Sequence, residues 1–179
     1  MFMKNKKLKH RGSREMVRLE KLSVKEGKNG KGAFVIDDFK KGQIICSLIG
    51  SIHRRNEMPK RDTKVTVRFI QIGKKTYLHV SGNGDYLNHS CNPNAGLVIK
   101  GTNVNLKAIK NIKRGKEVTF DYSTTMGEDE YELKCHCGNA NCRKKIRDFK
   151  YLPVTIQQKY VKLGIVPAHI LIALKHTHL

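Results

Sequence analysis

The side chains best suited to chemistry are concentrated in residues 88–94, which read Asn-His-Ser-Cys-Asn-Pro-Asn. This run combines amides, an imidazole, a hydroxyl and a thiol. Asn, Ser and Pro also dominate ordinary turns for backbone reasons, so the run taken alone fits a polar loop as well as a ligand site. Two later segments favour the ligand site, namely Phe120-Asp121-Tyr122 and the cysteine-rich residues 135–142.

The cysteine-rich segment predicts a zinc site. Cys135, Cys137 and Cys142 place three thiolates on one short loop, whereas structural zinc takes four tetrahedral ligands. The fourth ligand is Cys91, His136 or His89, and Cys91 would fasten this segment to the middle of the fold. The alternative is a loop of unligated thiols, which would have little core of its own and would oxidise readily.

The rest of the chain predicts a mostly β domain of the α+β class. Short apolar segments separated by glycine-containing turns indicate strands, and they lie at 33–36, 43–49, 64–72, 76–80, 95–99, 104–109 and 117–122. In 64–72 the alternation predicts Phe69 facing inward and Ile70 facing outward. Apolar spacing over 154–163 and 167–174 predicts two short helices that pack over the strands.

The charge is strongly basic. Among 179 residues, 36 Lys and Arg stand against 15 Asp and Glu, which gives a net charge of +21. This balance predicts association with polyanions such as nucleic acid, although a basic surface serving solubility is the simpler alternative. The sequence shows no apolar run of the roughly 18 residues needed to span a bilayer, and no apolar signal core at its start. We therefore expect an intracellular protein, either cytoplasmic or associated with the chromosome.

Three further features have simple interpretations. Cys46 lies in an apolar segment and is expected to be a buried small hydrophobe. The glycine-rich residues 27–32 lack the spacing of a phosphate-binding loop, so they predict a turn into a strand. The acidic run at 128–132 is either a solvated loop or a cradle for a lysine-rich peptide.

Four segments, in this order, resemble the motifs of the SET-domain protein lysine methyltransferases. They are GKGAF at 30–34, NHSCNPN at 88–94, GKEVTFDY at 115–122 and CHCGNANCR at 135–143. The resemblance covers roughly Gly27 to Ile146. It implies small curved β-sheets with a knot-like crossing, at which the third and fourth motifs lie side by side, followed by a post-SET zinc loop.

The resemblance also implies a division of the chain and a set of zinc ligands. A basic N-terminal arm is expected at 1–26, the SET domain at 27–124, the post-SET zinc segment at 125–148 and a helical tail at 149–179. By resemblance, the zinc ligands are Cys91, Cys135, Cys137 and Cys142.

The activity implied is transfer of a methyl group from S-adenosylmethionine to a protein lysine. Lys31, Gly32 and Phe34 would lie along the cofactor and contact its amino acid end through their backbone. Asn88 and His89 would hold its methionine and adenine portions, partly through backbone groups.

Two aromatic residues complete the implied site. Tyr122 matches the tyrosine at the methyl-transfer centre, where it also borders the cofactor. Phe120 matches the position that tunes how many methyl groups the product carries, and a phenylalanine there favours a di- or trimethyl product.

The sequence departs from the family pattern beside the third motif, where Asp85 replaces the usual Arg and Tyr86 the usual Phe. We expect these changes to alter local pairing and to leave the cofactor-facing residues intact. The expected substrate is a histone or another basic chromosomal or nucleic-acid-associated protein, with a ribosomal or other cytosolic protein as an alternative. A second class of function is a non-catalytic, zinc-stapled basic module that binds nucleic acid or a partner protein.

Overall fold

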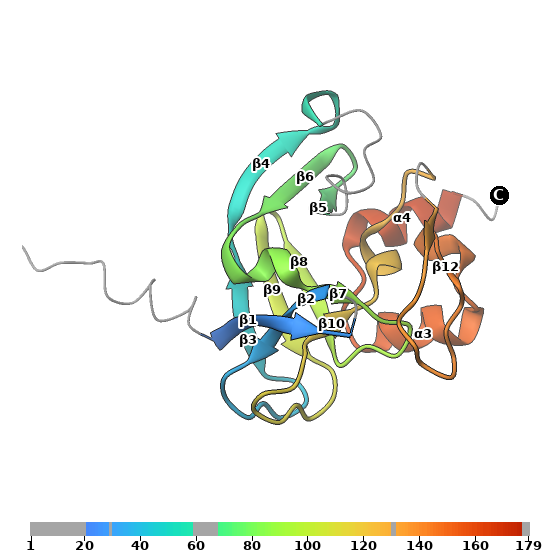
Figure 1. Cartoon of the computed structure of the whole chain (residues 1–179). Helices are drawn as coiled ribbons and strands as arrows, with labels where there is room; N and C mark the ends of the chain where they lie inside the picture. The colour runs from blue at the N-terminus through green and yellow to red at the C-terminus, as the bar shows by residue number, and fades with distance from the viewer. Residues whose placement is uncertain (1–20, 29, 59–67, 130–131, 177–179) are drawn as a thin grey trace, which may run out of the picture.

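Small β-sheets on one side of the molecule are flanked by a C-terminal helical layer on the other (Figure 1). The computed structural model describes residues 21–28, 30–58, 68–129 and 132–176. Most of the expected arm therefore lies outside the described residues. Strand β1 (Leu22–Gly27) begins inside the range expected for the arm, because it pairs along its whole length with β2 (Gly30–Val35).

Two three-stranded antiparallel sheets form the body of the domain. The first has the order β3-β9-β8, with bounds Ile44–Leu48, Asn103–Ala108 and Ala95–Lys100. The second has the order β4-β6-β5, with bounds Gly50–Arg54, Thr76–Val80 and Phe69–Gly73.

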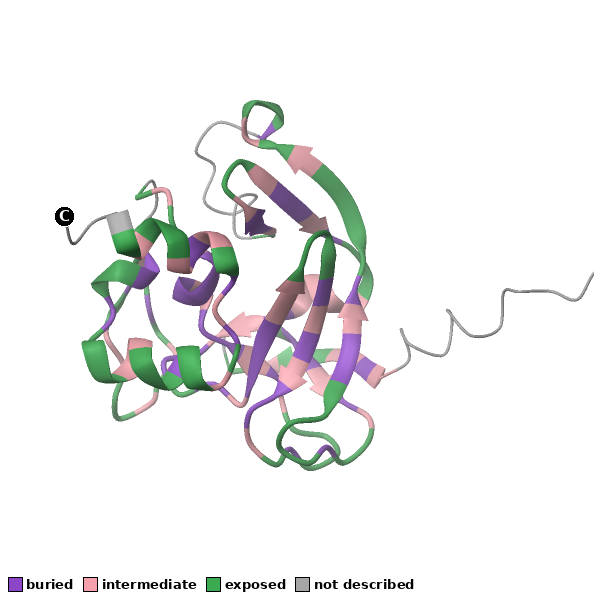
Figure 2. Ribbon diagram, turned by 180° about the vertical axis from the view of Figure 1, so that it is seen from behind, coloured by how far each residue is buried: buried purple, intermediate pink, exposed green. Residues whose placement is uncertain are grey.

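The main apolar core lies between these sheets and the β1–β2 hairpin, and buried residues are frequent along their strands (Figure 2). Ala33, Leu97 and Leu106 are among its fully buried members. Cys46 is buried in the same core, which confirms the expectation for this residue, and burial raises the pKa of its thiol to about 11.

The pattern expected for 64–72 is wrong at Ile70, which is 6 % exposed. Residues 64–67 lie outside the described part of the chain. Strand β5 buries Ile70, Gln71 and Ile72 in succession, because it contributes to the core and also to the wall of a pocket. A strand covered on both faces loses the polar–apolar alternation on which the prediction rested.

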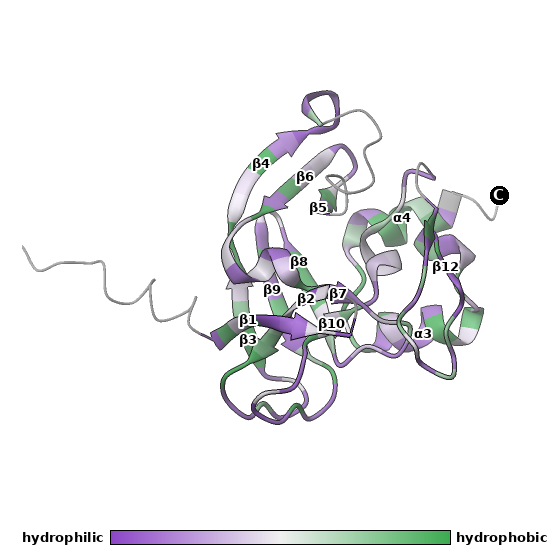
Figure 3. Cartoon of the chain, in the orientation of Figure 1, coloured by the Kyte–Doolittle hydropathy of each residue, from purple (hydrophilic) through white to green (hydrophobic). Residues whose placement is uncertain are grey.

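The C-terminal layer contains helices α3 (Val154–Lys162) and α4 (Ala168–His176), and both expected helices are confirmed. A second apolar cluster joins them to the sheets, in which Tyr160, Ile165 and Ile170 pack with Ile109 and Phe149. The colouring of α3 by hydropathy is mixed (Figure 3), since one side of the helix enters this cluster and the other meets solvent.

Two short strand pairs, β7 with β10 and β11 with β12, and several turns connect these layers. The two-residue strands are β7 (Asn88–His89), β10 (Thr119–Phe120), β11 (Leu133–Lys134) and β12 (Lys145–Ile146). Short 3₁₀ helices occupy Arg55–Glu57, Gly82–Tyr86, Tyr122–Thr125 and Phe149–Tyr151. None of the helices in the described ranges has both the length and the apolar character required to cross a membrane.

Candidate functional site

The centre of the site is the parallel pairing of β7 with β10, which sets Asn88 opposite Thr119 and His89 opposite Phe120. The two motifs expected to meet at the crossing are therefore side by side. Asn94 fixes this pairing with its side-chain amide, which donates to the Glu117 carbonyl at 2.8 Å and accepts from the Thr119 N–H at 2.9 Å. The side-chain amide of Asn94 thus makes the two hydrogen bonds that the backbone of a third strand would otherwise make here.

Tyr122 is the second residue after β10 and directs its hydroxyl to the carbonyl oxygen of Leu87, at 2.7 Å. Its ring lies beside that of Phe120, with centroids 4.8 Å apart. Burial raises the pKa of the Tyr122 phenol well above its usual value, and the carboxylates of Asp85 and Glu117 act in the same direction. Tyr122 is therefore a neutral hydroxyl, suited to orienting a reactant rather than to accepting a proton from it.

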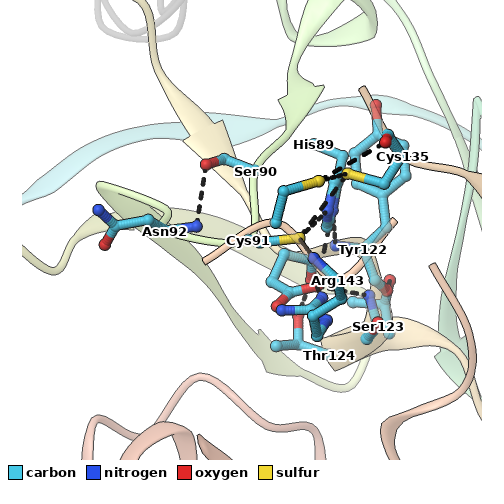
Figure 4. A network of polar contacts seen from close by, with 12 residues as sticks. His89, Ser90, Cys91, Asn92, Tyr122, Ser123, Thr124, Cys135 and Arg143 are labelled. Atoms are coloured by element: carbon cyan, nitrogen blue, oxygen red, sulfur yellow. Dashed lines mark hydrogen bonds and ion pairs between the residues drawn. The ribbon is translucent and has the colours of Figure 1, made fainter. Parts of the chain in front are cut away.

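His89 joins Tyr122 to the cysteine cluster (Figure 4). Its Nδ1 accepts the Tyr122 N–H at 3.2 Å, and its Nε2 lies 3.3 Å from the Cys91 Sγ. Burial lowers the pKa of His89 to about 4, against the opposite effect of the nearby Asp121 carboxylate. The imidazole is thus neutral, with its proton on Nε2 toward sulfur. Both ring nitrogens therefore contact protein atoms.

The four cysteines expected to bind zinc come together. The Sγ atoms of Cys91, Cys135, Cys137 and Cys142 all lie within 4.8 Å of one another. Those of Cys91 and Cys135 are 3.7 Å apart, and those of Cys135 and Cys142 are 3.6 Å apart. Four thiolates at a Zn–S distance of about 2.3 Å in a tetrahedron stand about 3.8 Å apart, so the cluster fits Zn²⁺. The alternatives His136 and His89 are outside this sulfur cluster.

A buried carboxylate connects three parts of the chain. Asp121, 1 % exposed, accepts from Arg143 Nη2 at 2.7 Å and from the Tyr160 hydroxyl at 3.1 Å. The backbone N–H of Arg143 in turn donates to the Cys91 Sγ at 3.4 Å. The zinc loop, the Tyr122 segment and helix α3 are therefore held together through Asp121.

This network was not predicted from the sequence, although the sequence position of Asp121 indicates a buried carboxylate that needs partners. Asp121 stands between two aromatic residues at the end of an apolar strand, and a buried carboxylate requires a cation and hydrogen-bond donors. Arg143, which follows the last cysteine, was a candidate for that cation. No local pattern pointed to Tyr160.

A cradle of polar contacts joins β7 to β2. The Asn88 Nδ2 donates to the Lys31 carbonyl at 3.1 Å and to the Glu117 Oε1 at 2.7 Å. Gly32 is buried beside these groups, and a Cβ at this position would overlap the Glu117 carboxylate. The half-buried Phe34 forms an isolated β-bridge with Glu117. Five of the six residues expected along the cofactor thus come from β2 and β7, and the sixth, Tyr122, comes after β10.

An apolar pocket opens beside Tyr122. Tyr122 and Phe120 line it together with Met58, Phe69, Ile70, Gln71, Tyr77, Thr125, Met126, Gly127, Glu128, Leu133 and Asp148. Apolar side chains supply most of the wall, and Glu128 and Asp148 add carboxyl groups. The Glu128 carboxylate lies 3.2 Å from the Arg55 Nε, and burial raises the pKa of Asp148. Such a pocket suits an aliphatic chain that ends in a cationic or amine group.

Neighbouring cations pair with the other acidic residues of the run that the structure describes. Asp129 forms an ion pair with Lys150 at 2.7 Å, and Glu132 pairs with Lys145 at 2.6 Å. Glu128 is thus the acidic residue of the run that faces the pocket, within the described part of 128–132. At the position that departs from the family pattern, Asp85 forms an ion pair with Arg68 at 2.8 Å. Asp85 thus has a cationic partner at this position.

The SET domain family model matches residues 30–123, and the chain belongs to this family. Human "Histone-lysine N-methyltransferase 2D" is 31 % identical over 128 residues, which cover 64 % of this chain and 2 % of that protein. "Histone-lysine N-methyltransferase ASHH3" from Arabidopsis thaliana is 28 % identical over 137 residues, which cover 69 % of this chain and 37 % of that protein. The chain thus spans a minor part of the length of these relatives.

Solved structures show the same fold. KRYPTONITE "in complex with mCHG DNA and SAH" has a TM-score of 0.56 and 24 % identity, over 70 % of this chain and 28 % of that one. Arabidopsis thaliana SUVH6 "in complex with SAM" has a TM-score of 0.57 and 20 % identity, over 70 % of this chain and 33 % of that one. The mostly β fold predicted from the sequence is confirmed.

Proposed function

We propose that this chain is an S-adenosylmethionine-dependent protein-lysine N-methyltransferase. The observation that carries the proposal is that Tyr122 lies at the β7–β10 crossing and also lines an apolar pocket. The polar cradle of Gly32, Asn88 and Glu117 joins β7 to β2 at the same crossing, and Phe120 lines the pocket together with Tyr122. A cofactor at the cradle and a lysine side chain in the pocket would meet at the Tyr122 hydroxyl.

The cradle suits the amino acid end of S-adenosylmethionine. An amide, a carboxylate and the backbone of Lys31 and Gly32 surround a position that has no room for a Cβ. The carboxylate and carbonyl acceptors of this set suit the ammonium group of that amino acid end, and the absence of a side chain at Gly32 admits close approach to the backbone. In this proposal Lys31, Gly32, Phe34, Asn88, His89 and Tyr122 border the cofactor.

The apolar pocket prepares the substrate lysine for methyl transfer by favouring its neutral amine. S-adenosylmethionine, when bound, supplies an electrophilic methyl group, so the lysine amine must arrive neutral although its free pKa is about 10.4. Apolar walls disfavour the charged ammonium and lower that pKa. The Tyr122 hydroxyl, held by the Leu87 carbonyl, orients the amine, and transfer then depends mainly on positioning and a prepared electrostatic environment.

In this proposal the zinc segment is a structural lid. Cys91, Cys135, Cys137 and Cys142 hold Zn²⁺, and the metal fastens residues 125–148 to the loop that follows β7. We propose that the SET domain extends to 124 and that residues 149–179 form an appended helical layer. The first strand of the proposed SET domain is β1, so the domain extends back to Leu22.

The proposed substrate is a histone or another basic chromosomal or nucleic-acid-associated protein. Two observations support this class. The relatives are named histone-lysine methyltransferases, and the net charge of +21 favours an environment rich in nucleic acid. A chromosome-associated location follows from the same proposal.

Methyl transfer from radiolabelled S-adenosylmethionine to core histones tests the proposal. We expect labelling by the wild type, and a loss of about 100-fold in Tyr122→Phe, because one positioned hydroxyl is removed. Tyr151→Phe, which removes an exposed hydroxyl bonded to Asp129, is the matched control and should retain wild-type rates. The proposal fails if the protein transfers no label to histones or to whole-cell lysate and calorimetry detects no cofactor binding. The non-catalytic basic module would then be the correct interpretation.

A further inference from the structure

The helical layer carries a cationic groove that the proposed methyl transfer does not use. It runs between helix α3 and the segment around Lys110, outside the pocket lined by Tyr122. Its lining consists of Lys41, Ile109, Lys110, Thr155, Gln158, Lys159, Lys162 and Leu163. Helix α3 also lies outside residues 30–123, the part of the chain that matches the family model.

The face of α3 in this groove consists of hydrogen-bond donors. Thr155, Gln158, Lys159 and Lys162 are spaced so that they fall on one side of the helix, and all four are exposed. The opposite side of α3 is occupied, because Tyr160 is buried and Leu163 packs against the same apolar cluster. Helix α3 is therefore fixed with this polar stripe outward.

The facing wall is also held in place. The backbone N–H of Lys41 donates to the Asn111 Oδ1 at 2.9 Å, and Ile109 is buried in the cluster that contains Tyr160. Lys110 contacts Asn92 through its ammonium, at 2.6 Å from Oδ1. Both walls of the groove, helix α3 and the segment around Lys110, are thus held in place by contacts with the rest of the fold.

The positive charge in this region has no acidic counterpart. Residues 86–116 and 149–179 contain neither Asp nor Glu. Within the described residues, Lys41, Lys159 and Lys162 form no ion pair, whereas Lys113 and Lys150 elsewhere on the surface each pair with a carboxylate. Burial and the nearby charge of Lys159 lower the pKa of Lys110, as expected where cations repel one another.

We propose that this groove binds the phosphate backbone of a nucleic acid. The donors from Thr155 to Lys162 extend over about 10 Å of helix at 1.5 Å per residue, which suits successive phosphates better than one small anion. Lysine, threonine and glutamine side chains are usual phosphate contacts that position a protein without reading sequence. An anionic membrane is the weaker candidate, because a helix that lies on a bilayer inserts its apolar side, and the largest apolar residues of α3, Ile156 and Tyr160, already pack in the internal cluster, which leaves only Val154 and Val161 of this helix as exposed apolar residues.

The test compares two double variants of the full-length protein that lose the same charge. Lys159→Gln/Lys162→Gln removes two cations from the groove. Lys74→Gln/Lys75→Gln removes two exposed cations from the turn between β5 and β6, which lies apart from α3 (Figure 1). Binding of a fluorescent 20-base-pair duplex is followed by anisotropy from about 0.05 to 0.3 M salt, a range in which phosphate contacts dominate affinity.

The groove variant should bind at least about tenfold more weakly at 0.1 M salt, and its slope of log affinity against log salt should be shallower by about 1.8, because each phosphate contact contributes about 0.9. The control should stay within about twofold of wild type. Unchanged thermal midpoints would show that both variants fold.

Equal losses in the two variants would overturn the proposal, because they would mean that the overall charge binds the duplex. Absence of duplex binding by the wild type would also overturn it. The proposal would also be overturned if the groove variant bound phosphatidylserine vesicles more weakly than the wild type does but bound the duplex equally well. None of these measurements involves methyl transfer, so the result is separable from that of the proposed function.

Discussion

One hydroxyl distinguishes the two aromatic residues at the inner end of the pocket. Tyr122 carries it and places it 2.7 Å from the Leu87 carbonyl, whereas Phe120, 4 % exposed, offers a plain ring 4.8 Å away. A second hydroxyl at position 120 would give the lysine amine an extra partner and occupy space that a methylated amine needs. We therefore expect the residue at position 120 to set the extent of methylation.

Phe120→Tyr should shift the product from di- or trimethyl-lysine to monomethyl-lysine. The added hydroxyl fills the space beside Tyr122 and restrains the amine after one transfer. Intact-mass analysis of the modified substrate reports the number of methyl groups directly. Monomethyl-lysine alone from both wild type and Phe120→Tyr would contradict this assignment.

At the scale of elements, the parallel pairing of β7 with β10 depends on helix α3, which is distant from it in sequence. Tyr160 donates to Asp121 at 3.1 Å, and Asp121 directly precedes Tyr122. A hydrogen bond to a buried charged group contributes about 1.5–3 kcal/mol. The helical layer thus helps to hold the Tyr122 segment in place.

Tyr160→Phe should lower the thermal unfolding midpoint by about 5 °C, since about 2 kcal/mol is lost at roughly 2–4 °C per kcal/mol in a chain of this size. Tyr151→Phe is the matched control, because its hydroxyl bonds the exposed Asp129 at 2.9 Å and should contribute little. Calorimetry of both variants measures the difference. Equal midpoints would show that the Tyr160–Asp121 contact is not a support for the site.

The elements differ in how far the sequence could predict them. The pairing of residues 88–94 with 115–122 and the four-cysteine cluster followed from motifs, because each motif contains the residues that make the contact. The Asp121 contacts with Arg143 and Tyr160 did not, since they join side chains 22 and 39 residues apart whose meeting depends on the tertiary packing of α3. Ile70 was misplaced because β5 is covered on both faces.

At the scale of the molecule, the loop that follows β7 connects folding to activity. Cys91 belongs to the zinc cluster, and His89 links its sulfur to the Tyr122 backbone. Zinc would perform no chemistry in the proposed reaction, yet an ion held by these cysteines would be shared by the proposed lid and the crossing. The same molecule separates a pocket bearing Glu128 from a cationic groove along α3, so a basic substrate and a polyanion have different places to bind.

Cys91→Ser, or removal of metal by a chelator, should reduce bound zinc from one ion per chain and lower the unfolding midpoint by on the order of 10 °C, because binding of a structural zinc is folding free energy. Methyl transfer should fall along with the midpoint. Elemental analysis and calorimetry measure the two effects. Cys46→Ser, which alters the buried thiol outside the cluster, is the control and should keep its zinc. Full zinc retention in Cys91→Ser would instead favour a histidine as the fourth ligand.

The most direct test of the central claim is identification of the atom that receives the methyl group. Wild-type protein is incubated with S-adenosylmethionine and histones, and the modified residues are sequenced by tandem mass spectrometry, beside Tyr122→Phe. The account predicts methyl groups on lysine ε-nitrogens with the wild type and almost none with the variant. Methylation on other atoms, or equal lysine methylation by both proteins, would contradict it.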